Sequence, residues 1–147
     1  MALYYKKKLV VKEIFIELRK NRHSVYKLTY HIVLVTKYRH KCITNDIFNA
    51  VKRKVESVIE NWNGSVIEIN HDKDHIHMLV ELPPQIAISN AVCSIKTVTS
   101  RLVKKEFKEY IEKFYWKESF WSNSYLALSV DGATLDVVKK YIEEQGL

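Results

Sequence analysis

The sequence predicts one α+β domain whose elements follow the order β-α-β-β-α-β-α. Three observations support this order. Short segments rich in β-branched and aromatic residues alternate with two long segments in which apolar residues recur at helical spacing. Asparagine, glycine and proline residues stand between several of these segments. The length of 147 residues, with 47% hydrophobic and 28% charged residues, suits a single globular domain without internal repeats.

Four segments have the composition of β-strands. Residues 25–36 form the longest, with valine, isoleucine, threonine and tyrosine throughout. Residues 65–70 and 75–82 lie on either side of a short turn at 71–74, so we expect them to form a hairpin that ends at two prolines. Residues 125–130 supply the fourth strand.

Three segments predict helices. The first spans residues 45–63 and stops at an Asn-Gly pair. The second spans residues 88–107, and the third spans residues 134–145. Residues 1–23 are a lysine-rich extension, in which we expect a short helix ending at Leu18.

This order of elements is that of the ferredoxin-like, or RRM-like, βαββαβ fold with one added C-terminal helix. The two long helices can cover only one face of its antiparallel sheet, which leaves the opposite face to the last helix. We therefore expect one domain over residues 1–147, with a variable extension at 1–23 and the core at 24–147.

The charge balance favours a polyanionic partner. Twenty-four basic residues against 17 acidic ones give a net charge of +7, which suits nucleic acid. We find no signal peptide and no membrane-spanning segment, and Cys42 and Cys93 stand far apart outside any Cys-x-x-Cys spacing. We expect a cytoplasmic protein with reduced thiols and no membrane partner.

A histidine cluster at the start of the predicted strand 75–82 is the first candidate for chemistry. Residues two apart on a strand share a face, so His75 and His77 project side by side. They form half of a metal site, and Asp74 is a candidate to orient one of them. Two histidines do not define a metal site, so a structural pair, or a three-histidine zinc site that includes His71, remains open.

The last predicted helix offers the other half of such a site. Tyr141 and Gln145 are four residues apart and therefore share a helix face. Two imidazoles and an amide oxygen leave open positions on a divalent ion, which can polarise a phosphate. The phenolate of Tyr141 can then attack phosphorus, although a phenol with an ordinary pKa of about 10 needs help to lose its proton.

Basic and aromatic side chains supply candidate DNA contacts, since cations bind phosphates and aromatic rings stack on single-stranded bases. A solvated charged face is the alternative explanation for the cations. The candidates are Lys37, Tyr38, Arg39, Lys96, Arg101, Lys104, Lys105, Trp121 and Tyr125.

Several segments in a fixed order resemble the single-tyrosine HUH transposases of bacterial and archaeal insertion sequences, the IS200-like family of histidine–hydrophobe–histidine nucleases. The similarity spans residues 25–145. The matching segments are Tyr30 to Arg39, Asp74 to Val80, Pro83-Pro84, Ser94 to Leu102, Phe120 to Tyr125 and Thr134 to Gln145.

The resemblance implies a transposase that cuts and rejoins single-stranded DNA at hairpin-marked ends of an insertion sequence. It implies His75, His77 and Gln145 as ligands of Mg²⁺ or Mn²⁺ and Tyr141 as the nucleophile, which would leave a 5′-phosphotyrosine and a free 3′-hydroxyl. It also implies a homodimer in which the tyrosine helix of one subunit can complete the active site of the other.

The chain departs from the family pattern in one segment and at three single positions. Residues 1–23 have no counterpart in it, and Asn123 stands where a proline is common. Leu128 and Asp131 stand where glycines are common, just before the predicted tyrosine helix. Two other functions stay open: a non-catalytic ferredoxin-like module that binds nucleic acid, and a zinc protein built on the three histidines.

Overall fold

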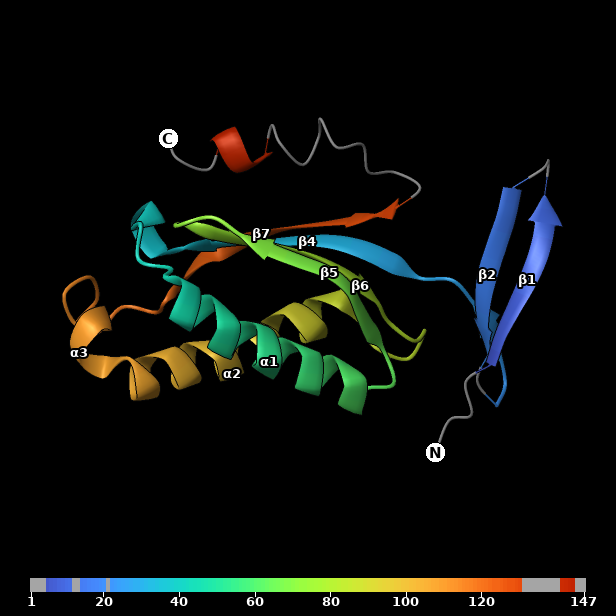
Figure 1. Ribbon diagram of the computed structural model, residues 1–147, viewed down its shortest axis with the longest axis horizontal. Coiled ribbons are helices and arrows are strands. Elements are labelled where there is room, and N and C mark those ends of the chain that lie inside the picture. Colours follow the sequence, from blue (N-terminus) through green and yellow to red (C-terminus); the bar gives the residue numbers. More distant parts are fainter. Residues whose placement is uncertain (1–4, 12–13, 21, 131–140, 145–147) are drawn as a thin grey trace.

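An antiparallel sheet forms the centre of the protein (Figure 1). The computed structural model describes residues 5–11, 14–20, 22–130 and 141–144. Within these residues the central sheet has four strands in the order β5-β6-β4-β7, which is the strand order of the ferredoxin-like fold. The fold class predicted from the sequence is therefore confirmed. The strands are β4 (Thr29–Thr36), β5 (Ser65–His71), β6 (His75–Glu81) and β7 (Trp121–Ser129).

Two long helices cover one face of this sheet (Figure 1). Helix α1 (Asn45–Asn61) is capped at its N-terminus by Thr44, whose hydroxyl accepts a hydrogen bond of 3.2 Å from the backbone N–H of Ile47. Helix α2 (Ile88–Glu106) lies beside it, and a single turn, α3 (Lys108–Ile111), follows. None of the helices in the described part of the chain has the length and apolarity needed to cross a bilayer.

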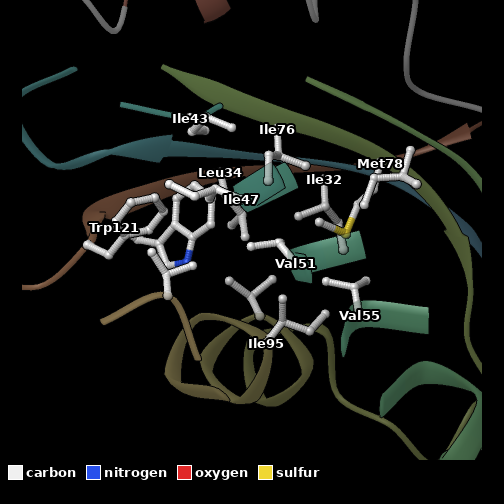
Figure 2. Close-up of a cluster of buried hydrophobic side chains, with 14 of the residues drawn as sticks. Ile32, Leu34, Ile43, Ile47, Val51, Val55, Ile76, Met78, Ile95 and Trp121 are labelled. Carbon is white, nitrogen blue, oxygen red and sulfur yellow. The ribbon is translucent and has the colours of Figure 1, made fainter. Parts of the chain in front are cut away.

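The core lies between the sheet and these two helices (Figure 2). Alternate residues of β4 and β6 point into it, and Ile32, Leu34, Ile76 and Met78 are each at most 1% exposed. Burying an aliphatic side chain of this size stabilises the fold by about 1.5–3 kcal/mol. The partners from the helices and from β7 are Ile47, Val51, Val55, Ile95 and Trp121.

The N-terminal extension corrects one expectation. The helix expected to end at Leu18 is wrong, because β1 (Tyr5–Val11) and β2 (Ile14–Lys20) form an antiparallel hairpin. The short strand β3 (Val25–Tyr26) adds to β2 and completes a sheet of three strands within the described residues. The apolar runs in this segment are rich in β-branched residues, which favour strand pairing once a partner strand is available.

Two further boundaries differ from the prediction. The long strand expected at 25–36 is divided into β3 and β4, and the backbone C=O of Leu28 between them accepts a hydrogen bond from Leu82 N–H at 3.0 Å. Strand β7 begins at Trp121 rather than at residue 125, because Trp121 pairs with Thr36 and packs into the core.

Glu81 at the end of β6 joins the extension to the core. Its carboxylate accepts hydrogen bonds from Arg19 Nε at 2.7 Å and from Lys27 Nζ at 2.5 Å, and its side chain is 7% exposed. Burial raises the pKa of Glu81, but the Lys27 hydrogen bond and the two positive charges outweigh it and leave the pKa below its ordinary value. Glu81 is thus a carboxylate that ties two N-terminal cations to the sheet.

Candidate active site

Two histidines lie on the sheet face that α1 and α2 do not cover. In the β4–β6 pair, His77 is opposite Val33 and His75 is opposite Val35. Both valines point away from the main core and belong to a second, smaller apolar cluster. Because cross-strand partners share a face, His75 and His77 project on the same side as these valines. We call this side the tyrosine face, defined by Val33, Val35, His75 and His77.

Tyr141 lies on this same face. Residues 141–144 are helical, and this segment lies over the sheet on the side opposite α1 and α2 (Figure 1). Tyr141 and Ile142 pack against the Val33–Val35 cluster, together with two leucines of β7. The two valines that seat the tyrosine are the direct cross-strand partners of the two histidines. The rest of the predicted helix, including Gln145, lies outside the described residues.

The phenol of Tyr141 is held in its protonated form. Its Oη is buried and makes no hydrogen bond of standard geometry to any described residue. Burial raises the pKa of Tyr141, and the nearby Ser124 hydroxyl only partly opposes this shift. To act as a nucleophile, Tyr141 would need a base or a nearby positive charge to accept or stabilise the loss of its proton.

Asp74 fixes the orientation of His75. Its Oδ1 lies 2.8 Å from Nδ1 of His75, and its Oδ2 accepts a hydrogen bond of 2.8 Å from Nε of Arg39. Burial raises the pKa of Asp74, but the hydrogen bonds from His75 and Arg39 outweigh this and leave it below its ordinary value. An ionised carboxylate can only accept hydrogen bonds, so Nδ1 of His75 is the donor. The lone pair of Nε2 is then available to bind a metal ion or accept another hydrogen bond.

His77 has a different partner, His31 of β4. Nδ1 of His31 lies 3.0 Å from Nε2 of His77, and the rings stack with centroids 5.3 Å apart. Burial lowers the pKa of His77, and the charge of His31 lowers it further. A neutral imidazole is the form that binds a metal. The alternation of β4 could have identified His31, since it is two residues from Val33 and shares its face.

His71 lies on the other face of the sheet. Its cross-strand partner is Ile76, which is in the main core, and its ring stacks on Phe48 of α1 with centroids 4.1 Å apart. The three-histidine zinc site is therefore wrong, because His71 cannot join His75 and His77 through the sheet. Within the described residues, no three histidine, cysteine, aspartate or glutamate side chains are placed to hold a metal together.

The candidate DNA contacts near residue 38 differ in their availability. Tyr38 is 68% exposed, and Lys37 Nζ lies 5.4 Å from the centroid of its ring. Arg39 is committed to contacts within the protein, with Asp74 and with the backbone carbonyl of Ile142 at 2.8 Å from Nη1. Tyr38 therefore offers an open stacking surface, whereas the side chain of Arg39 is 24% exposed.

The remaining candidates lie along α2 and the edge strand β7. Lys96, Arg101 and Tyr125 line a groove of about 520 Å³ between these elements. Lys96 donates to the backbone carbonyls of Ser122 at 2.6 Å and Asn123 at 3.3 Å, and thereby holds its charge over β7.

The last three candidates, Lys104, Lys105 and Trp121, differ in their exposure and in their contacts within the protein. Lys104 bonds to the carbonyl of Glu118, and Lys105 is exposed. Trp121 borders the groove but is 2% exposed, and its indole N–H donates to Thr99 at 2.9 Å, so its ring belongs to the core.

The fold and the site together define a class: a ferredoxin-like domain with a histidine pair and a tyrosine on one face of its sheet. Residues 24–145 match the family model described as "Transposase IS200 like". The chain therefore belongs to the IS200-like transposase family. Strands β1 and β2 lie before the matched region.

Individual relatives agree with this assignment. The chain is 31% identical over 130 residues to the ISDra2 transposase TnpA of Deinococcus radiodurans, which covers 88% of this chain and 92% of that protein. It is 29% identical over 123 residues to the transposase for insertion sequence element IS200 of Salmonella typhimurium, covering 84% and 80% of the two chains.

Solved structures share the fold. A crystal structure of a protein from Deinococcus radiodurans R1 assigned as a transposase superposes with a TM-score of 0.77 at 28% identity, over 86% of this chain and 96% of that one. A REP-associated tyrosine transposase superposes with a TM-score of 0.50 at 12% identity, over 84% and 68%, and shows a likeness of fold alone.

The seat of Tyr141 yields a prediction about stability. We expect Tyr141→Phe to leave the free energy of unfolding unchanged or to raise it by up to about 1 kcal/mol, because the buried hydroxyl of Tyr141 makes no hydrogen bond of standard geometry that would offset its lost hydration. Urea unfolding followed by tryptophan fluorescence measures this. The matched control is Tyr115→Phe, which removes a buried 2.6 Å hydrogen bond to the Lys37 carbonyl and should cost about 1–2 kcal/mol. Equal losses in both variants would contradict the assignment.

Proposed function

We propose that this transposase cuts and rejoins single-stranded DNA at the ends of an insertion sequence through a covalent bond to Tyr141. The observation that carries this proposal is the packing of Tyr141 against Val33 and Val35. These valines are the cross-strand partners of His77 and His75. This packing brings a tyrosine and two histidines to one face of the sheet. Geometry of this kind suits in-line attack on a phosphate.

The chemistry follows from the phenol. Oη of Tyr141 loses its proton and forms a bond to phosphorus, while the bond from phosphorus to the 3′-oxygen breaks and that oxygen takes up a proton. The products are a 5′-phosphotyrosine and a free 3′-hydroxyl. Rejoining is the reverse reaction, with a 3′-hydroxyl attacking the phosphotyrosine. Burial raises the pKa of Tyr141, so the attack requires a base or a positive charge that assists the loss of the phenol proton.

We propose that His75 and His77 hold Mg²⁺ or Mn²⁺, with Gln145 as the third ligand. The donor set fits a divalent ion, because Asp74 orients His75 and burial favours the neutral form of His77. A bound ion would polarise the scissile phosphate. The third ligand must be an amide, a water or a group outside the described residues, since no third acidic, cysteine or histidine ligand converges there within them.

We propose a DNA hairpin at the element end as the recognised partner. The net charge of +7 favours binding to a polyanion, and the REP-associated tyrosine transposase of the same fold is bound to a REP hairpin. The side chains best placed to contribute are the exposed or partly exposed cations and tyrosines. They are Lys37, Tyr38, Lys96, Arg101, Lys104, Lys105 and Tyr125.

Covalent attachment tests the nucleophile. We expect wild-type protein with Mn²⁺ to form a denaturant-resistant adduct with single-stranded DNA from the flanks of its own coding sequence, and Tyr141→Phe to form none while still binding the hairpin. Gel electrophoresis under denaturing conditions measures the adduct. Tyr110→Phe, a partly buried tyrosine of α3 far from the tyrosine face, is the matched control and should retain it. An adduct in Tyr141→Phe, or hairpin binding by wild type with no adduct, would favour a different nucleophile or a non-catalytic module.

Metal affinity tests the histidine pair. We expect His75→Ala and His77→Ala each to weaken Mn²⁺ binding by at least about tenfold, since each removes a ligand or its orientation. His71→Ala is the control, because His71 faces α1 on the other side of the sheet. Titration calorimetry on protein purified without chelator measures the three affinities. A comparable loss in His71→Ala would contradict the division of histidines between the two faces.

We further propose that the active form is a homodimer. Strand β7 is an outer strand of the described central sheet, and an edge strand can pair with the same strand of a second copy. Light scattering on the purified protein should give twice the chain mass of 17.4 kDa. A monomeric mass at concentrations that support adduct formation would reject the dimer.

A further inference from the structure

One guanidinium connects the histidine pair to the tyrosine segment. Arg39 donates from Nε to Asp74 Oδ2 at 2.8 Å and from Nη1 to the backbone carbonyl of Ile142 at 2.8 Å. The other oxygen of Asp74 lies 2.8 Å from Nδ1 of His75. An unbroken series of short polar contacts therefore runs from His75 through Asp74 and Arg39 to the residue next to Tyr141.

The backbone around Arg39 holds it in an unusual conformation. Tyr38 and Arg39 have φ values of 60° and 53°, a left-handed conformation that is unfavourable for a non-glycine residue. The segment is fixed before the turn, where Thr36 N–H donates to the Asp74 carbonyl at 2.9 Å and the Lys37 carbonyl accepts from Tyr115. Conformational strain retained beside a candidate active site indicates that the direction of the Arg39 side chain matters.

The acceptors of Arg39 match its chemistry. A carboxylate and a carbonyl of a short helical segment both favour a cation, and the planar guanidinium reaches two acceptors at once. Lysine carries the same charge on one nitrogen and cannot reproduce this geometry. Partial burial of both side chains, at 24% and 12% exposure, strengthens the contact relative to a surface ion pair.

We propose that Arg39 is a positioning residue that couples the docking of the tyrosine segment to the orientation of the metal ligand His75. The inference rests on the proposed function of Tyr141 and His75. We call the two hydrogen bonds of Arg39, to Asp74 and to the Ile142 carbonyl, the Arg39 bridge. Without this bridge, the tyrosine segment loses a hydrogen bond at Ile142, and Asp74 loses a partner that holds it against His75. Arg39 would therefore act on metal affinity and on tyrosine placement without touching DNA.

Three variants separate the bridge from the charge. Arg39→Gln removes both the charge and the guanidinium that reaches two acceptors, whereas Arg39→Lys keeps the charge alone. Lys41→Gln removes an exposed cation from the same loop without affecting Asp74. The readouts are amide hydrogen exchange at residues 141–144 in the folded protein, Mn²⁺ affinity by calorimetry, and the rate of adduct formation. A merely structural role would change the unfolding midpoint and leave the first two readouts as in wild type.

The expected results are specific to the bridge. Arg39→Gln should speed exchange at residues 141–144 by about tenfold and weaken Mn²⁺ binding and adduct formation by about 10–100-fold. Arg39→Lys should recover only part of each loss, and Lys41→Gln should match wild type. In a double-mutant cycle, Asp74→Asn combined with Arg39→Gln should weaken Mn²⁺ binding no more than the stronger single variant, because both act through His75.

Wild-type exchange and Mn²⁺ affinity in Arg39→Gln would overturn the inference. If the salt dependence of single-strand binding then falls by about one counterion, Arg39 is a DNA contact instead. If Arg39→Gln fails to fold, the same readouts on Arg39→Lys decide, with wild-type values overturning the inference. Absence of an adduct in wild type would refute the proposed function, whereas the exchange and Mn²⁺ measurements would still decide the bridge.

Discussion

The alternation of side chains along the paired strands β4 and β6 is the constraint on which the rest of the structure depends. One set of residues, represented by Leu34 and Ile76, points into the core beneath the helices, and the intervening set carries His75 and His77 to the opposite face. A shift of one residue in this register would bury the histidines and expose the core. Stability and candidate chemistry are therefore specified by the same pairing, and neither can change without the other.

This division explains which features the sequence could predict. The shared face of His75 and His77, the order of helices and strands along the core of the chain and the approximate extent of α1 follow from local periodicity, which the tertiary structure only reinforces. The position of His71 does not follow from local periodicity. Strand β5 shifts register between Val66 and Glu68, and this bulge reverses the faces of the residues after it. Alternation from Val66 without the bulge would have placed His71 beside the pair.

The other differences have similar causes. The extension forms a hairpin because a β-branched segment becomes a strand when a partner strand is available to pair with it. Local sequence does not identify that partner strand. The contacts of Arg39 depend on left-handed φ values at two non-glycine residues, which no local propensity predicts. Tyr141 packs on the sheet face that the two long helices leave open, whereas Gln145 lies outside the described residues.

The two candidate ligands are prepared in different ways, one by a hydrogen bond and the other by partial burial. His75 is oriented by a carboxylate that Arg39 keeps ionised, while His77 is kept neutral by burial beside His31. Burial that favours a neutral imidazole also favours a protonated phenol, so the face that prepares His77 for a cation suppresses Tyr141. A cation at the histidine pair would resolve this conflict, because a positive charge stabilises the phenolate that burial disfavours. If Tyr141 is the nucleophile and the histidine pair holds the metal, as proposed above, the buried tyrosine would become reactive only when the histidine site is filled.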